Sequence, residues 1–127
     1  MGGWMMLRET AIDRLGAKRG RPDKPPIDVA HLKAQTMGNR DLEKQVLRLF
    51  LRKSGECIER IKAAADTADR SEAAHTLVGS ARAVGAFSVA YIASEIERSK
   101  APVTGRLIAL DRAIEAARFV IADRLAE

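Results

Sequence analysis

The chain has 127 residues, of which 46% are hydrophobic and 31% charged, a composition typical of one soluble globular domain. No apolar run approaches the roughly 20 residues that cross a bilayer, and Trp4-Met5-Met6-Leu7 is too short for the core of a signal peptide. The single cysteine excludes an internal disulfide, so a reducing, cytoplasmic compartment is expected.

The net charge of +5 is concentrated near the N-terminus. Residues 1–26 carry a net charge of +3 together with several glycines and prolines, which predicts a basic, flexible tail with one short helical segment around residues 5–15. Residues 27–127 hold the remaining +2 and lack the aromatic residues interleaved with basic ones that a single-strand binder needs. We therefore expect neither a nucleic-acid partner nor a membrane partner.

From Ile27 onward the pattern is helical. Asp28 is a suitable N-cap for a short helix over residues 29–37, which Gly38-Asn39 would end. A long helix over residues 41–65 follows, with an apolar stripe wide enough to pack against more than one neighbour. This stripe consists of Leu42, Val46, Leu49, Phe50, Cys57 and Ile61. Cys57 is therefore expected to be a buried small hydrophobe.

A third helix is expected to start at Asp69 or Ser71, with Glu72 completing a capping box in the first case, and to end near Gly85. A fourth helix covers residues 87–99.

A fifth helix, over residues 103–126, begins after Pro102. No segment alternates apolar and polar residues as a half-buried strand would. The fold class predicted is all-α: an up-down antiparallel four-helix bundle over residues 27–127 with a short extra N-terminal helix. Because four helices can close a core without a second chain, we expect a monomer.

The third helix carries a histidine on the side that should face water. At 100° per residue its apolar positions form one stripe, made of Leu77, Ala81 and Val84. With Ala73 at zero, His75 falls at about 200°, nearly opposite that stripe, and Gly79 and Arg82 lie beside it on the next two turns. Neutral imidazole is a nucleophile available near pH 7. An exposed imidazole on a rigid helix suits a reaction with a partner protein.

The presence of Gly79 inside the helix needs an explanation, because glycine lowers helix stability by about 1 kcal/mol relative to alanine. One reason is a close helix–helix contact. The other is clearance, since a missing side chain one turn from His75 gives a partner access to the imidazole. The position of Gly79, away from the apolar stripe, favours clearance.

Residues 74–86, Ala-His-Thr-Leu-Val-Gly-Ser-Ala-Arg-Ala-Val-Gly-Ala, resemble the signature of histidine-containing phosphotransfer (HPt) domains of bacterial two-component phosphorelays. The resemblance extends over residues 27–127. It implies a four-helix bundle in which His75 accepts a phosphoryl group from the aspartyl phosphate of a receiver domain and passes it to another receiver. The implied partners are response-regulator receiver domains and a hybrid histidine kinase. The Mg²⁺ would belong to the receiver, and the chain itself would need no cofactor.

One residue departs from the family pattern. HPt domains usually have a lysine three residues after the histidine, where this chain has Val78. Arg82 is then the best-placed cation to contact the phosphoryl group, since a guanidinium suits phosphate oxygens. Val78 would supply an apolar contact at the rim of the docking surface. Ser80 would either bond a backbone carbonyl or help to orient the His75 ring.

No other pattern indicates catalysis. Glu95 and Glu97 point about 100° apart on one helix, so we interpret them as part of a solvated face. His31 has no chemical companions and is expected at the surface or in packing. Two histidines 44 positions apart and one cysteine predict no metal site. The chain also lacks an ATP-binding motif, so we expect a phosphocarrier without kinase activity.

Three alternatives remain at this point. The bundle could bind receivers without transferring phosphate, for which Val78 is the best support. The basic tail could belong to a small DNA-binding protein. Finally, the dimerisation domain of a histidine kinase also exposes a histidine, although an acidic residue generally follows it there, where this chain has Thr76.

Overall fold

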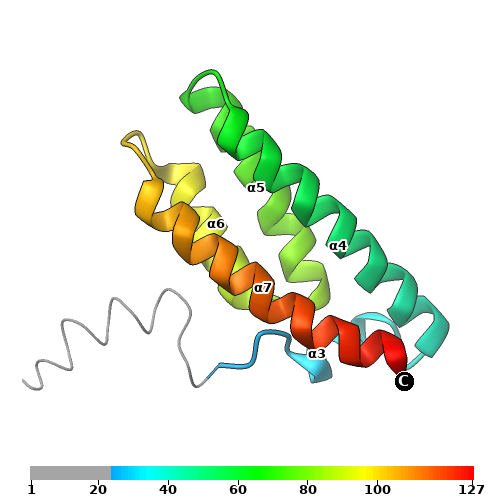
Figure 1. Ribbon diagram of the computed structural model, residues 1–127. Coiled ribbons are helices and arrows are strands. Elements are labelled where there is room, and N and C mark those ends of the chain that lie inside the picture. The colour runs from blue at the N-terminus through cyan, green and yellow to red at the C-terminus, as the bar shows by residue number, and fades with distance from the viewer. Residues whose placement is uncertain (1–23) are drawn as a thin grey trace, which may run out of the picture.

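The computed structural model describes residues 24–127, so the helical segment predicted around residues 5–15 and nearly all of the predicted tail lie outside the described part. The described part consists of five helices without a strand, which confirms the all-α prediction (Figure 1). The helices are α3 (Val29–Gln35), α4 (Arg40–Ala63), α5 (Thr67–Val84), α6 (Phe87–Arg98) and α7 (Thr104–Ala126). Within residues 24–127, no helix is long and apolar enough to cross a membrane.

The start of α3 agrees with the sequence prediction, since the Asp28 side chain accepts a hydrogen bond from the backbone N–H of His31 at 3.0 Å. The end of α3 comes earlier than predicted, at Gln35. Met37 and Gly38 then adopt positive φ values of 53° and 72°. These two residues turn the chain so that Asn39 can cap α4.

The predicted cap of the third helix is wrong. The N-cap of α5 is Asp66, whose side chain accepts from the backbone N–H of Asp69 at 2.8 Å, so the helix begins at Thr67. Asp69 thus lies inside the first turn, and Ser71 lies deeper in the helix. An aspartate three residues before another offered the same capping geometry one turn earlier.

The turn between α5 and α6 requires a glycine. Gly85 has a φ of 81°, and the N–H of Ala86 donates back to the carbonyl of Ala81 at 2.9 Å, a closure typical of a glycine-ended helix. A Cβ on Gly85 would lie 2.8 Å from the backbone oxygen of Asp28. The Asp28 N–H also donates to the Gly85 carbonyl at 2.9 Å. The start of α3 is therefore tied to the turn that follows the histidine helix.

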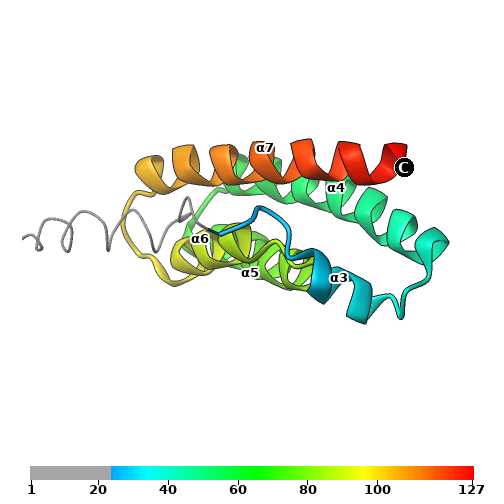
Figure 2. The ribbon, with the colours of Figure 1, turned by 90° about the horizontal axis from the view of Figure 1, so that it is seen from below.

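The four long helices form two layers, α4 beside α7 and α5 beside α6, with α3 at one end against α5 (Figure 2). The core between them is aliphatic, and its largest fully buried members include Leu47, Leu77, Ile92, Ile96, Leu110 and Ile121. Cys57 is buried as predicted, and burial raises the pKa of its thiol. Leu49, predicted to join the apolar stripe of α4, is instead 43% exposed.

A buried ionic cluster joins the start of α4 to the end of α7. Glu43 is 2% exposed and accepts hydrogen bonds from Nε and Nη2 of Arg124 at 2.9 and 3.0 Å, and a further one from Arg40. Burial alone would raise the pKa of the Glu43 carboxyl. The hydrogen bonds and positive charges of Arg124 and Arg40 outweigh burial, so this pKa is held below its ordinary value.

The lowered pKa of Glu43 predicts acid sensitivity. Stability from this carboxylate is fully present above its unfolded-state pKa of about 4.3 and is lost as the pH falls through the folded-state value. Replacing Glu43 by Gln should cost about 3–5 kcal/mol at pH 7, because it removes the buried carboxylate bonded to Arg124 and leaves that largely buried arginine only the more distant Glu127 carboxylate, at 3.8 Å. The cost should begin to shrink as the pH falls below the unfolded-state pKa of about 4.3, and it should be smallest once the pH has passed through the lower folded-state pKa and the native carboxyl is itself protonated.

Urea unfolding at several pH values checks this. The matched control is Glu56→Gln, which breaks an exposed pair with Arg52 of 3.9 Å and should change stability by less than about 0.5 kcal/mol. A cost of Glu43→Gln that is the same at pH 7 and pH 3 would contradict the role of this ionised cluster.

Candidate functional site

His75 lies in the middle of α5 with its side chain 75% exposed. Gly79 and Arg82, one and two turns further on, are exposed on the same face. The predicted core stripe of the helix is buried on the other side, at Leu77, Ala81 and Val84. The helical periodicity therefore predicted correctly which face of α5 carries the histidine.

Gly79 has open space beside it. A Cβ built on this residue would meet nothing within 4 Å, apart from the helix's own neighbouring backbone. Gly79 is therefore not a close contact between helices. The open position lies one turn from His75, as the clearance interpretation expects.

The His75 ring is held by a glutamate from the neighbouring helix. Nδ1 of His75 lies 2.8 Å from Oε2 of Glu97, which is on α6 and 30% exposed. An ionised carboxylate can only accept in this bond, so in the neutral form of the imidazole Nδ1 carries the hydrogen and Nε2 has the lone pair. The arrangement leaves a nucleophilic nitrogen on an exposed ring that a hydrogen bond orients.

The interpretation of Glu95 and Glu97 as a solvated face is wrong. Glu97 binds His75, and Glu95 is 16% exposed with Oε1 lying 3.9 Å from Nε of Arg106. The sequence did contain a signal for the first contact. His75 precedes Gly85 by ten residues and Glu97 follows it by twelve, so an antiparallel pair of helices that turns at Gly85 places them at nearly the same height.

The structure corrects the prediction for Val78. This residue is 5% exposed and belongs to the core, so it is not an apolar contact at the rim of a docking surface. It lies about 60° around the helix from His75, which is enough to turn its side chain away from solvent. Ser80 is partly buried, and its hydroxyl makes no hydrogen bond within residues 24–127, so neither role expected for it is seen.

Arg82 is exposed, and within the described residues its guanidinium has no ion-pair partner. Its backbone carbonyl accepts a hydrogen bond from Nε2 of His31 at 3.0 Å. The His31 ring also packs edge-on against Phe87, with 5.0 Å between ring centroids. His31 is thus a packing residue, in agreement with the prediction.

Comparison with protein families decides the identity of this bundle. The model of the Hpt domain matches residues 45–119, a range that includes His75, Gly79 and Glu97. The chain belongs to the Hpt domain family. Hpt domains act in phosphotransfer during two-component signalling. Comparisons with curated proteins and with solved structures gave no match.

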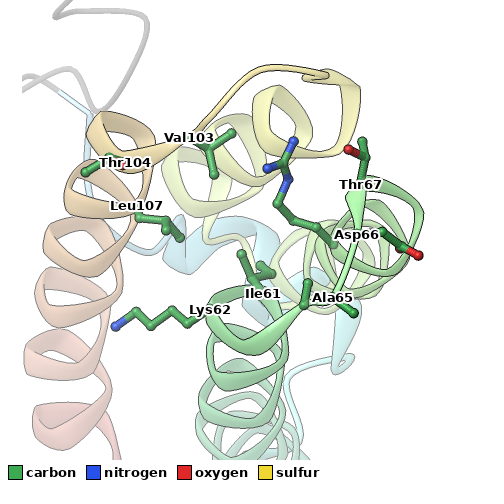
Figure 3. Close-up of a pocket in the computed structure, with 10 residues that line it drawn as sticks. Ile61, Lys62, Ala65, Asp66, Thr67, Val103, Thr104 and Leu107 are labelled. Atoms are coloured by element: carbon green, nitrogen blue, oxygen red, sulfur yellow. The ribbon is translucent and has the colours of Figure 1, made fainter.

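The Hpt domain also has a hollow of about 340 Å³, between the end of α4 and the starts of α5 and α7 (Figure 3). Its charged side chains all make contacts within the fold, although the buried Nε of Arg70 has no hydrogen-bond partner within residues 24–127. Asp66 caps α5, and Nζ of Lys62 lies 3.4 Å from Oδ2 of Asp111. Nη2 of Arg70 donates to the carbonyls of Ser99 and Ala101 in the loop after α6. Within residues 24–127, no three His, Cys, Asp or Glu side chains are grouped to hold a metal ion.

Proposed function

We propose that this Hpt domain accepts a phosphoryl group on His75 from the aspartyl phosphate of a receiver domain and passes it to a second receiver. The observation that carries the proposal is the pairing of His75 with Glu97, with Nδ1 bonded at 2.8 Å and the ring 75% exposed. This arrangement points to Nε2 as the accepting atom.

The proposed transfer moves the phosphoryl group from an aspartyl oxygen to a histidine nitrogen and then to a second aspartyl oxygen. The Nε2 lone pair attacks phosphorus in line, a P–N bond forms, and the P–O bond to the aspartyl group breaks with its electrons leaving on the carboxylate. The His75 ring then carries a positive charge, which the Glu97 carboxylate beside Nδ1 stabilises. In the onward step an aspartate carboxylate oxygen of the second receiver attacks phosphorus and a P–O bond forms. The P–N bond breaks with its electrons returning to the ring, which leaves as neutral imidazole with its Nδ1 hydrogen still in place.

Two neighbours on α5 have distinct proposed roles. Gly79 gives the receiver access to Nε2, because a Cβ there would meet only open space. Arg82 is proposed to contact the phosphoryl oxygens from two turns away, since no carboxylate within residues 24–127 forms an ion pair with its guanidinium. The catalytic Mg²⁺ is proposed to belong to the receiver, and the Hpt domain is proposed to act as a phosphocarrier without kinase activity.

The wider proposal concerns assembly and partners. We propose an up-down antiparallel arrangement of α4 to α7 in a monomer, supported by the order in which these helices pack on one another. The proposed partners are response-regulator receiver domains and a hybrid histidine kinase. A cytoplasmic setting fits the single cysteine, which is free and buried.

A second candidate is an Hpt-like module that binds receivers without transferring phosphate. The residue three positions after His75 favours it, because Val78 is apolar and buried and so offers no charge to a phosphoryl group. The labelling experiment below separates the two candidates, since only the first requires a covalent phosphoryl group on this chain.

The first test concerns the accepting residue. His75→Gln should abolish labelling by a phosphorylated receiver, because it removes the nucleophile. Its melting temperature should stay nearly unchanged, since the side chain is exposed. His31→Gln replaces the other histidine of the chain and should still be labelled. Label that survives in His75→Gln, or a wild-type protein that takes no label, would contradict the transfer proposal.

The second test concerns access. Gly79→Leu should strongly reduce transfer by obstructing the receiver, while the bundle folds with equal or slightly higher stability because leucine is the better helix former. Gly55→Leu on α4 is the matched control, since a Cβ at Gly55 also meets open space. The two variants should differ in transfer rate and not in folding. Equal transfer in both would show that clearance at Gly79 is unimportant.

The third test concerns charge. Arg82→Ala should slow transfer by up to about tenfold, as expected for loss of a charge-assisted contact worth about 1.5 kcal/mol or less at a solvated site. Arg112→Ala, which removes an exposed arginine from α7, should leave the rate unchanged. Rapid-mixing measurements with a phosphorylated receiver give both rates. If they are indistinguishable, Arg82 is an ordinary surface charge.

A further inference from the structure

The end of α6 is fastened by side chains from α5. The last carbonyls of a helix lack partners within the helix. Helix α6 ends at Arg98, and the residue that follows it is Ser99 in extended conformation, not a glycine. The hydroxyl of Ser71 donates to the Glu97 carbonyl at 2.9 Å. Arg70 donates through Nη2 to the carbonyls of Ser99 at 2.9 Å and Ala101 at 3.1 Å.

Ser71 and His75 are separated by one helical turn, so they lie above one another on α5. Both bind Glu97, Ser71 through the backbone carbonyl and His75 through the carboxylate. A single turn of α5 thus holds both ends of one residue of α6.

This double attachment matters because little else orients the imidazole. The His75 ring is 75% exposed, and Glu97 provides its only hydrogen bond among the described residues. Glu97 is itself 30% exposed, so water competes with its carboxylate for the hydrogen bond to Nδ1 of His75. Fixing the backbone of Glu97 limits where the carboxylate can lie and so favours the bond to Nδ1.

We infer that Ser71 is a positioning residue for phosphotransfer, acting through Glu97 to keep the hydrogen of His75 on Nδ1 and the lone pair on Nε2. The inference rests on the proposed function for its kinetic consequence. Its structural consequence, the tautomer of His75, can be measured in the protein alone.

The test compares Ser71→Ala with Ser94→Ala in the full chain. Ser94 is a matched control, because its hydroxyl also donates to a helix carbonyl, that of Tyr91 at 2.7 Å, and makes no hydrogen bond to Glu97. Nitrogen NMR of the imidazole gives the fraction of the Nδ1–H tautomer. Rapid mixing at saturating phosphorylated receiver gives the transfer rate constant, and titration gives the receiver Kd.

Ser71→Ala should lower the Nδ1–H fraction and slow transfer by about three- to tenfold, the range expected for one neutral hydrogen bond, with the receiver Kd unchanged. Ser71→Thr, which keeps the hydroxyl, should restore both values. Ser94→Ala should match the wild type.

An equal Nδ1–H fraction in Ser71→Ala and Ser94→Ala would overturn the inference. So would equal slowing in the two variants, since it would show a general effect on α6. If the wild type takes no phosphoryl group, the proposed function fails, and the tautomer measurement still decides whether Ser71 positions His75.

Discussion

The site depends on the antiparallel packing of α5 against α6, which Gly85 fixes. Its left-handed conformation lets the chain reverse directly after the histidine helix, and the contact with Asp28 leaves no room for a Cβ there. Once the turn is set, the heights of residues on the two helices are set as well. His75 and Glu97 meet because of this geometry. Ser71 meets the same residue of α6 one turn earlier.

The elements and the exposed face of α5 could be predicted from the sequence, because helical periodicity is a property of one segment at a time. The contact of His75 with Glu97 could not be read from one helix, since it requires the register between two. Val78 was misplaced for a different reason, because a residue 60° around the helix from an exposed one can lie on either its exposed or its buried face. Glu43 was missed because a glutamate is seldom buried unless it is paired, and its partner Arg124 is distant in the sequence.

The groups that stabilise the fold lie apart from the exposed face that carries His75. The aliphatic core and the Glu43–Arg124 pair hold the helices together away from the face that carries His75. That face can therefore keep a glycine in mid-helix and an exposed ring, both of which contribute little to stability. Gly79 is the clearest instance, because the open space beside it is of no use to packing. Such a position is better explained by a partner than by the fold.

Under the proposed function, the charges on this face determine which of the charges that develop during transfer the Hpt domain stabilises and which the receiver must neutralise. Glu97 lies against the ring and stabilises positive charge on it, but a carboxylate there also repels an arriving phosphoryl group. Arg82 lies seven residues further along α5, a rise of about 10 Å, and Val78 offers no charge in between. The Hpt domain therefore activates and orients the nucleophile, while most of the neutralisation of phosphoryl charge falls to the receiver. Transfer should then depend closely on how well the receiver is docked, because the two halves of the electrostatic site meet only in the complex.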